Sequence, residues 1–144
     1  MHVAGLLRSK GDEVATVAPS ATVGVVVAAL AEHKVGALVV SGDGQQVDGI
    51  VSERDVVRAL AEQGGAVLDV EVATIMTTKV VTCEVSTSVD ELASLMTEGR
   101  YRHVPVVVEG ALAGIVSIGD VVKSRIKDLE DEKQTLHEYI SGGR

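Results

Sequence analysis

Residues 114–120 read Gly-Ile-Val-Ser-Ile-Gly-Asp, and residues 49–55 read Gly-Ile-Val-Ser-Glu-Arg-Asp. In each copy a short apolar run typical of a β-strand ends at a serine, and an aspartate and two valines follow. The pattern predicts a strand that turns directly into a helix, made twice, 114 − 49 = 65 residues apart. A serine hydroxyl and free N–H groups at a helix N-terminus suit a phosphate, and a carboxylate one turn further in suits the hydroxyls of a ribose. The candidate ligand-binding residues are therefore Ser52, Asp55, Ser117 and Asp120.

The rest of the chain repeats as well. Residues 14–17 match residues 80–83 as short strands, and a polar helix start follows each. Both helices then carry apolar residues at i, i+3, i+4 and i+7, which predicts one buried face. These stripes are Val23, Val26, Val27 and Leu30 in the first copy, and Val89, Leu92, Ala93 and Met96 in the second.

Apolar runs at residues 37–40 and 104–108 lead through turns into the two Gly-Ile-Val runs and predict β-hairpins. Each repeat is thus expected to run strand, helix, strand, strand, helix, a mixed α/β (α+β) arrangement. Short helical segments at residues 3–10 and 70–77 are expected to lead into the two repeats. One repeat has too little area to cover its own apolar surface, so the two copies are expected to pack as a pseudo-twofold pair around a shared core.

Composition excludes several functions. The 144 residues include no Phe or Trp and only two Tyr, and the net charge is −8. A nucleic-acid binder needs a basic surface and usually stacking rings, so no nucleic-acid partner is expected. No apolar run is long enough to cross a bilayer and no secretory leader is recognisable, which predicts a soluble protein with no membrane partner. Cys83, the single cysteine, is expected to be a packing residue, and its being alone favours the cytoplasm.

The second closing helix is expected to run on to about Ile140. Its apolar positions step by four and three residues, a heptad-like seam with one basic interruption. The seam predicts association with a second copy of the chain, although a tail folded back on its own lobe is the alternative, and residues 141–144 are expected to be a frayed end. The seam residues are Val122, Ile126, Leu129, Lys133, Leu136 and Ile140.

The ordered set of motifs resembles the CBS domain, a module that occurs in pairs. The resemblance is carried by residues 75–83, 88–92 and 102–106 and by both corners, and it covers almost the whole chain. It implies a tandem βαββα pair (a Bateman module), with domains at residues 3–65 and 70–126 and an extended C-terminal helix and tail at residues 127–144. It further implies homodimers shaped as a flat disc, an unidentified target protein, and clefts for AMP, ADP, ATP, S-adenosylmethionine or NAD(H). No obligatory cofactor is implied.

The resemblance also implies roles for individual residues. Asp55 and Asp120 would take ribose hydroxyls, and Ser52 and Ser117 would sit by the phosphate or ribose. Arg102 and His103 would reach phosphates across the cleft, and Arg54 is a further phosphate candidate. Backbone groups around four residues would line the adenine pockets: Thr16, Leu38, Thr82 and Val104.

Differences between the repeats make the two clefts unequal. The first repeat is expected to have Val35-Gly36 in the place of Arg102-His103 in the second. The second corner has Gly119 where the first has Arg54. The two clefts are therefore not expected to be equivalent.

Ser-x-x-Asp is also a helix capping box, in which the two side chains satisfy free N–H groups and bind nothing. Two copies at matched strand ends, in a chain that resembles nucleotide sensors, favour ribose binding by at least one aspartate, and capping and binding can coexist. No metal-ligand spacing and no nucleophile–base pair is found, so neither a metal site nor an enzyme is expected. The predicted function is a regulatory module for adenosine-containing ligands, and the alternative is a constitutive dimeric scaffold whose clefts are vestigial.

Overall fold

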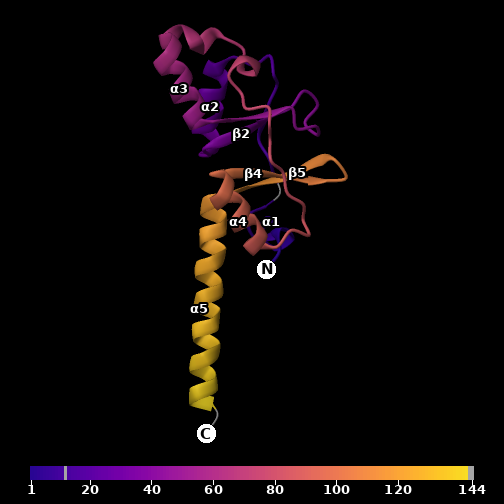
Figure 1. The fold of residues 1–144 in the computed structure, drawn as a ribbon, viewed down its shortest axis with the longest axis vertical. Coiled ribbons are helices and arrows are strands. Elements are labelled where there is room, and N and C mark those ends of the chain that lie inside the picture. The colour runs from indigo at the N-terminus through magenta and orange to yellow at the C-terminus, as the bar shows by residue number, and fades with distance from the viewer. Residues whose placement is uncertain (12, 143–144) are drawn as a thin grey trace.

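The computed structural model describes residues 1–11 and 13–142. It contains two small α/β lobes and one long helix that extends away from them (Figure 1). The predicted mixed α/β class and the repeated strand–helix order are confirmed. The last two residues of the predicted frayed end lie outside the described residues.

Lobe 1 is built around a three-stranded sheet in the order β1-β2-β3. Strand β1 (Thr16–Val17) pairs parallel to β2 (Ala37–Val40), which pairs antiparallel to β3 (Gly49–Ser52). All four residues of β2 are buried, as expected for a central strand that is covered by helices. The covering helices are α2 (Val23–His33), α3 (Glu53–Gln63), and the 3₁₀ turns η1 (Gly64–Asp69) and η2 (Val72–Thr74).

Lobe 2 repeats this plan with a smaller sheet. Strand β4 (His103–Val108) pairs antiparallel to β5 (Ala111–Ser117), and α4 (Val89–Gly99) covers them. The predicted strand at residues 80–83 is wrong, because only Cys83 pairs, through a single parallel bridge to Val106. The Val80 N–H donates instead to the Thr78 carbonyl 3.0 Å away, so Val80 is part of a tight turn and not of a strand ladder.

The helical lead-ins cross between the lobes. Helix α1 (Val3–Lys10) packs its buried Val3, Leu6 and Leu7 into the core of lobe 2, whereas Val67 and Val72 lie in the core of lobe 1. The prediction of one shared core is therefore wrong. The buried residues form two clusters, and the exchanged lead-ins tie the lobes together.

The glycine of each Gly-Ile-Val run makes room for the crossing chain. A Cβ on Gly114 would lie 2.6 Å from a Leu7 methyl carbon, and a Cβ on Gly49 would lie 2.6 Å from the sulfur of Met76. Such separations are inside van der Waals contact, so a Cβ at Gly114 would force the Leu7 side chain to shift. At Gly49 the backbone is also too close, because the Thr77 carbonyl oxygen would lie 2.9 Å from the Cβ. The repeated sequence thus encodes the close approach as well as the corner.

Helix α5 (Ile118–Gly142) is 25 residues long and carries the chain away from both lobes (Figure 1). Val121 and Ser124 on its first turns are buried, and the described residues that follow are exposed except for the half-buried Asp128. The predicted extent of the helix is confirmed, and the alternative of a tail folded back on its own lobe is wrong. In the part of the chain that the structure describes, no helix combines the length and the apolar character that a bilayer span requires.

Candidate functional site

Ser52 and Asp55 form a complete capping box at the first corner. The Asp55 N–H donates to Ser52 Oγ (3.3 Å), and Asp55 Oδ2 accepts from the Ser52 N–H (2.9 Å) and hydroxyl (3.1 Å). Helix α3 therefore starts with its N-terminal N–H groups partly satisfied by its own side chains. The capping interpretation is correct, and it leaves Asp55 Oδ1 without a donor among the described residues.

The first corner lies in a cleft of about 600 Å³. One wall is the start of α3 together with Gly36 and Ala37 of lobe 1, and the facing wall is the segment from the end of α4 to the start of β4 in lobe 2. Of the residues predicted from the sequence, the cleft brings together Ser52, Arg54, Asp55, Arg102 and His103.

The lobe 2 wall is shaped by the end of α4. Arg100, the residue after the helix, has the left-handed conformation (φ 58°, ψ 36°), which turns the chain sharply into β4. Gly99 has no room for a Cβ, because the ring of Tyr101 lies against it. This tight turn presents Arg100, Tyr101 and Arg102 together to the cleft.

His103 closes the cleft beside Gly36. A Cβ on Gly36 would meet His103 Cε1 and Nε2 at 3.3 Å and Glu53 Oε1 at 3.5 Å, so the imidazole occupies the space that a side chain there would need. Burial lowers the pKa of His103, and the neighbouring Arg102 lowers it further. The neutral form of the ring is therefore favoured at pH 7.

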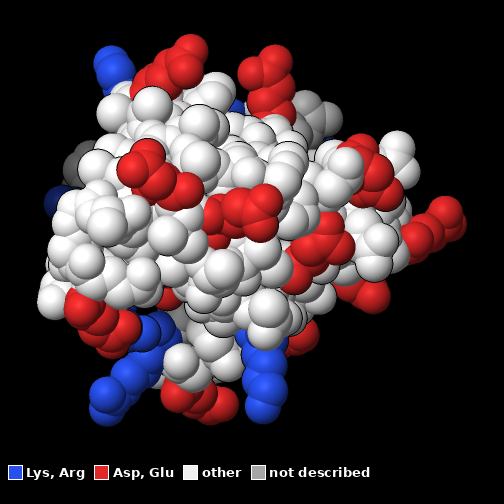
Figure 2. Space-filling model, turned by 90° about the horizontal axis from the view of Figure 1, so that it is seen from above, with Lys and Arg blue, Asp and Glu red and all other residues white. Residues whose placement is uncertain are grey.

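Three guanidinium groups and two carboxylates line this cleft: Arg54, Arg100 and Arg102 against Glu53 and Asp55. The chain as a whole is acidic, with a net charge of −8 at pH 7. Figure 2 shows acidic side chains scattered over the face seen from above, with the Lys and Arg side chains mostly at its margin. The cleft is therefore a local concentration of anion-binding groups on an acidic molecule.

The second corner has the same capping box but a different neighbour. The Ser117 N–H donates to Asp120 Oδ2 (2.8 Å), and the Asp120 N–H donates to Ser117 Oγ (3.2 Å). Lys10 of α1 donates to the same Oδ2 (2.7 Å) and to the Ile115 carbonyl (2.7 Å). Burial alone would raise the pKa of Asp120, but the bonds from Lys10 and Ser117 outweigh it and lower the pKa.

The sheet registers correct the predicted alignment of the repeats. In lobe 2, His103 pairs with Ser117, and the Arg102 carbonyl accepts from the Ile118 N–H. The equivalent pairs in lobe 1 are Ala37 with Ser52, and the Gly36 carbonyl with the Glu53 N–H. Gly36 and Ala37, not Val35 and Gly36, are thus the counterparts of Arg102 and His103. The predicted asymmetry remains, since neither counterpart can carry a charge.

Six predicted residues do not line this cleft, and two of them, Ser117 and Asp120, form the second corner instead. Leu38 and Val104 are buried in the two cores, Thr16 pairs with Val39 in the lobe 1 sheet, and Thr82 is exposed next to Cys83. Sequence reasoning missed nine residues that do line it. The Arg-Tyr-Arg-His run at residues 100–103 was a usable signal for two of them, because two cations flank a ring there. The missed residues are Gly36, Ala37, Ile50, Glu53, Val57, Thr77, Gly99, Arg100 and Tyr101.

Metal-binding side chains do not converge in this structure. Over residues 1–11 and 13–142, no three His, Cys, Asp or Glu side chains come close enough to hold one ion. The groups that meet in the cleft are instead hydroxyl, carboxylate, guanidinium and imidazole, which suit a polyhydroxylated anion.

Comparison with known proteins places this geometry in a family. A sequence model described as the CBS domain matches residues 9–62 and 72–127. The mitochondrial CBS domain-containing protein CBSX3 of Arabidopsis thaliana is 40% identical over 126 residues, which are 85% of this chain and 61% of that protein. The chain therefore spans less than two thirds of that relative.

Solved structures agree with the sequence match. A CBS-domain containing protein from Agrobacterium tumefaciens superposes with a TM-score of 0.83 at 49% identity, covering 87% of this chain and 99% of that one. The CBS domain pair of protein MJ0100, solved in complex with 5′-methylthioadenosine and S-adenosyl-L-methionine, superposes with a TM-score of 0.76 at 23% identity, covering 85% and 98%. At 23% identity, the similarity to protein MJ0100 shows a shared fold and no more.

Proposed function

Because the chain belongs to the CBS domain family, we propose that it is a non-catalytic regulatory module that binds an adenine nucleotide in the cleft of Ser52 and Asp55. AMP, ADP and ATP are the ligands that we propose first. The observation that carries the proposal is one cleft of about 600 Å³ with a capped serine–aspartate corner on one wall and Arg100, Arg102 and His103 on the other.

The two walls suit the two ends of a nucleotide. Asp55 Oδ2 is used by the capping box, and the other carboxylate oxygen can accept from the hydroxyls of a ribose, so capping and binding use different atoms. The guanidinium groups of Arg54, Arg100 and Arg102 suit phosphate oxygens. A fold relative binds two adenosine-containing molecules, 5′-methylthioadenosine and S-adenosyl-L-methionine, which supports the adenosyl class.

The charges favour a phosphorylated ligand over a cationic one. S-adenosylmethionine carries a positive sulfonium centre, and three guanidinium groups in the same cleft oppose it. NAD(H) carries a pyrophosphate and remains a weaker candidate, because its second nucleoside needs further space. We therefore place the mononucleotides ahead of S-adenosylmethionine and NAD(H).

The first corner is the better ligand site of the two. Asp120 is paired with Lys10, so a ribose there would have to displace an ion pair before it could bind. No cationic side chain in residues 1–11 or 13–142 pairs with Asp55, and the cleft around it is lined from both lobes. We propose one nucleotide per chain at the first corner.

A ligand held between the lobes would act by differential affinity. It can shift an equilibrium between two lobe arrangements only by the difference between its affinities for them, typically about 1–3 kcal/mol. The module would then pass the change to a target protein, and we propose that it does so as a homodimer. A reducing compartment such as the cytoplasm is proposed on the ground that the only cysteine, Cys83, is buried.

Isothermal titration calorimetry with AMP, ADP, ATP and adenosine tests the proposal. Asp55→Asn keeps an oxygen acceptor for the cap but removes the charge, and Asp120→Asn makes the same change at the corner held by Lys10. We expect binding near one nucleotide per chain, weakened at least tenfold by Asp55→Asn and little changed by Asp120→Asn. If no nucleotide binds to the folded wild-type protein, the clefts are vestigial and the scaffold function is correct instead.

A further inference from the structure

Helix α5 exposes an apolar stripe that is interrupted once, by Lys133. We call it the α5 seam. Its five apolar members are each 50–65% exposed, which is unusual for side chains of this size in a row. The seam residues are Val122, Ile126, Leu129, Lys133, Leu136 and Ile140.

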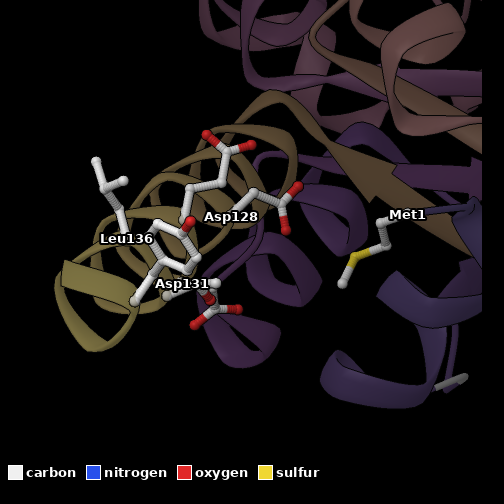
Figure 3. A pocket seen from close by; sticks show the side chains of 7 residues that line it. Met1, Asp128, Asp131 and Leu136 are labelled. Atoms are coloured by element: carbon white, nitrogen blue, oxygen red, sulfur yellow. The ribbon is translucent and has the colours of Figure 1, made fainter. Parts of the chain in front are cut away.

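The seam lies to one side of the face of α5 that packs on lobe 2. Val121 and Ser124, the buried residues of α5, face lobe 2, and the Ser124 hydroxyl lies 3.2 Å from the sulfur of Met1. Figure 3 shows Met1 on the side of α5 from which Asp128 projects, with Leu136 projecting away from it. Of the seam residues, Leu136 alone lines the hollow that Met1 also lines, so most of the seam is open to a second helix.

The spacing of the seam is that of a two-stranded coiled coil. Steps of four and three residues place its members alternately at the d and a positions of a heptad repeat. Parallel dimers favour β-branched residues at a and leucine at d, and a single lysine at a fixes the register. The a positions here are Ile126, Lys133 and Ile140, and the d positions are Val122, Leu129 and Leu136.

The residues beside the seam select the direction of the partner helix. In a parallel pair, a g residue of one helix lies next to the e residue of the following heptad on the other, so Arg125 lies next to Glu130 and Glu132 lies next to His137. Arg125 also pairs with Asp90 of its own chain, 2.6 Å away, so it would be shared between the two carboxylates. In an antiparallel pair, the two seams overlap most fully when Ile126 of one helix lies opposite Leu136 of the other. Glu130 then lies next to Glu130 of the second copy, and Glu132 next to its Glu132. Like charges at those positions disfavour the antiparallel pair.

The seam also forms a shallow groove along the helix. A hollow of about 500 Å³ is lined by Glu130, Lys133, Gln134, Leu136, His137 and Ile140. It contains the a, d and e positions of the last two heptads, where the side chains of a second helix would insert. From Val122 to Ile140 the seam is roughly 27 Å long at 1.5 Å per residue.

We propose that α5 pairs along this seam with α5 of a second copy as a parallel, two-stranded coiled coil. The lobes then lie on the outer faces of the pair, one on each side. This inference rests on the homodimer of the proposed function and specifies its direction and register. The matched family segments end at residue 127, so most of the coil lies beyond the CBS pair.

Disulfide trapping in the full-length protein tests direction and register. Cys83 is buried, and burial raises the pKa of its thiol to about 11, so it remains protonated and unreactive at pH 8. Under mild oxidation, we expect Leu136→Cys to give a covalent dimer as the major species. Asp131→Cys, on the outer face of the same helix, is expected to stay monomeric on a non-reducing gel.

Each of three other results would contradict a different part of the proposed dimer. If Leu136→Cys cross-links only when mixed with Ile126→Cys, the pair is antiparallel. If sedimentation shows a dimer that neither variant traps, the dimer forms elsewhere and the coiled coil is wrong. If the wild-type protein sediments as a monomer at micromolar concentration, the dimer and the coiled coil both fail, while nucleotide titration of that monomer still tests the cleft.

Discussion

Lys10 Nζ lies 2.7 Å from Asp120 Oδ2, and this ion pair makes the two repeated corners chemically different. Both side chains are partly shielded, with 33% of Lys10 and 22% of Asp120 exposed. The lysine comes from the lead-in that crosses into lobe 2, so the exchange of lead-ins decides which aspartate is available to a ligand. The consequence can be measured without any ligand.

Lys10→Met is expected to destabilise the protein by about 1 kcal/mol at pH 7, because it removes a partly buried ion pair and a bond to the Ile115 carbonyl. The lowered pKa of Asp120 contributes stability above the ordinary aspartate pKa of about 4, and this is lost as the pH falls through the folded-state value. As the pH falls from about 5 to below the folded-state pKa of Asp120, the variant should therefore lose less stability than wild type. Urea unfolding at several pH values measures both effects, and Lys79→Met, at an exposed lysine, should reproduce neither.

The sequence predicted the corners and the helices well, because each is set by local residues. The Ser-x-x-Asp boxes and the 3.6-residue stripes depend on neighbours within one or two turns. Lys10 opposite Asp120, and Arg100 opposite Ser52, depend on contacts between distant parts of the chain. A single sequence could not place these, because nothing local indicates that α1 packs in lobe 2. The missing strand before Cys83 has the same origin, since pairing depends on a partner that the local β pattern does not reveal.

His103→Gln is expected to reduce the loss of stability between pH 7 and pH 5. Burial and Arg102 lower the pKa of His103, so the unfolded chain takes up the proton first as the pH falls below about 6.5. Wild-type protein then loses stability through that window, and glutamine, which does not titrate, removes this part of the loss. Thermal unfolding against pH provides the measurement. His137→Gln, on the exposed part of α5, serves as the control, and an equal effect of both variants would show that the environment of His103 is not responsible.

Arg100→Ala is expected to weaken ADP binding roughly tenfold while leaving adenosine binding nearly unchanged. A hydrogen bond to a charged group contributes about 1.5–3 kcal/mol, and the lower end applies at a cleft that is open to water. Arg58→Ala removes an exposed guanidinium of α3 that does not line the cleft and should leave both affinities unchanged. Equal losses for ADP and adenosine would contradict a phosphate role for Arg100. Calorimetry at fixed salt separates the two ligands.

Gly114→Ala is expected to destabilise the protein by about 1–3 kcal/mol, because the added methyl group would overlap Leu7 of the crossing lead-in. Gly65→Ala is the matched control, since a Cβ there meets nothing within 4 Å. Combining Gly114→Ala with Leu7→Ala should cost less than the sum of the two changes, because the smaller side chain makes room for the methyl group. Chemical denaturation of the four proteins completes the cycle, and strict additivity would refute the close approach of α1 to β5.

Lys133→Ile tests the coiled coil by stabilising it. In a parallel pair Lys133 occupies the central a position, where a lysine is tolerated at a cost in stability and fixes the register. Isoleucine there would make the seam apolar throughout, and we expect the melting temperature of the dimer to rise by about 3 °C or more. Lys127→Ile adds the same residue on the outer face of α5 and should leave the dimer no more stable. If both variants raised the melting temperature equally, the gain would come from the helix surface rather than from a buried seam.

A second measurement distinguishes a tighter dimer from a more stable monomer. Because the melting temperature of a dimer depends on its concentration, the rise should be accompanied by a lower dissociation constant in sedimentation equilibrium.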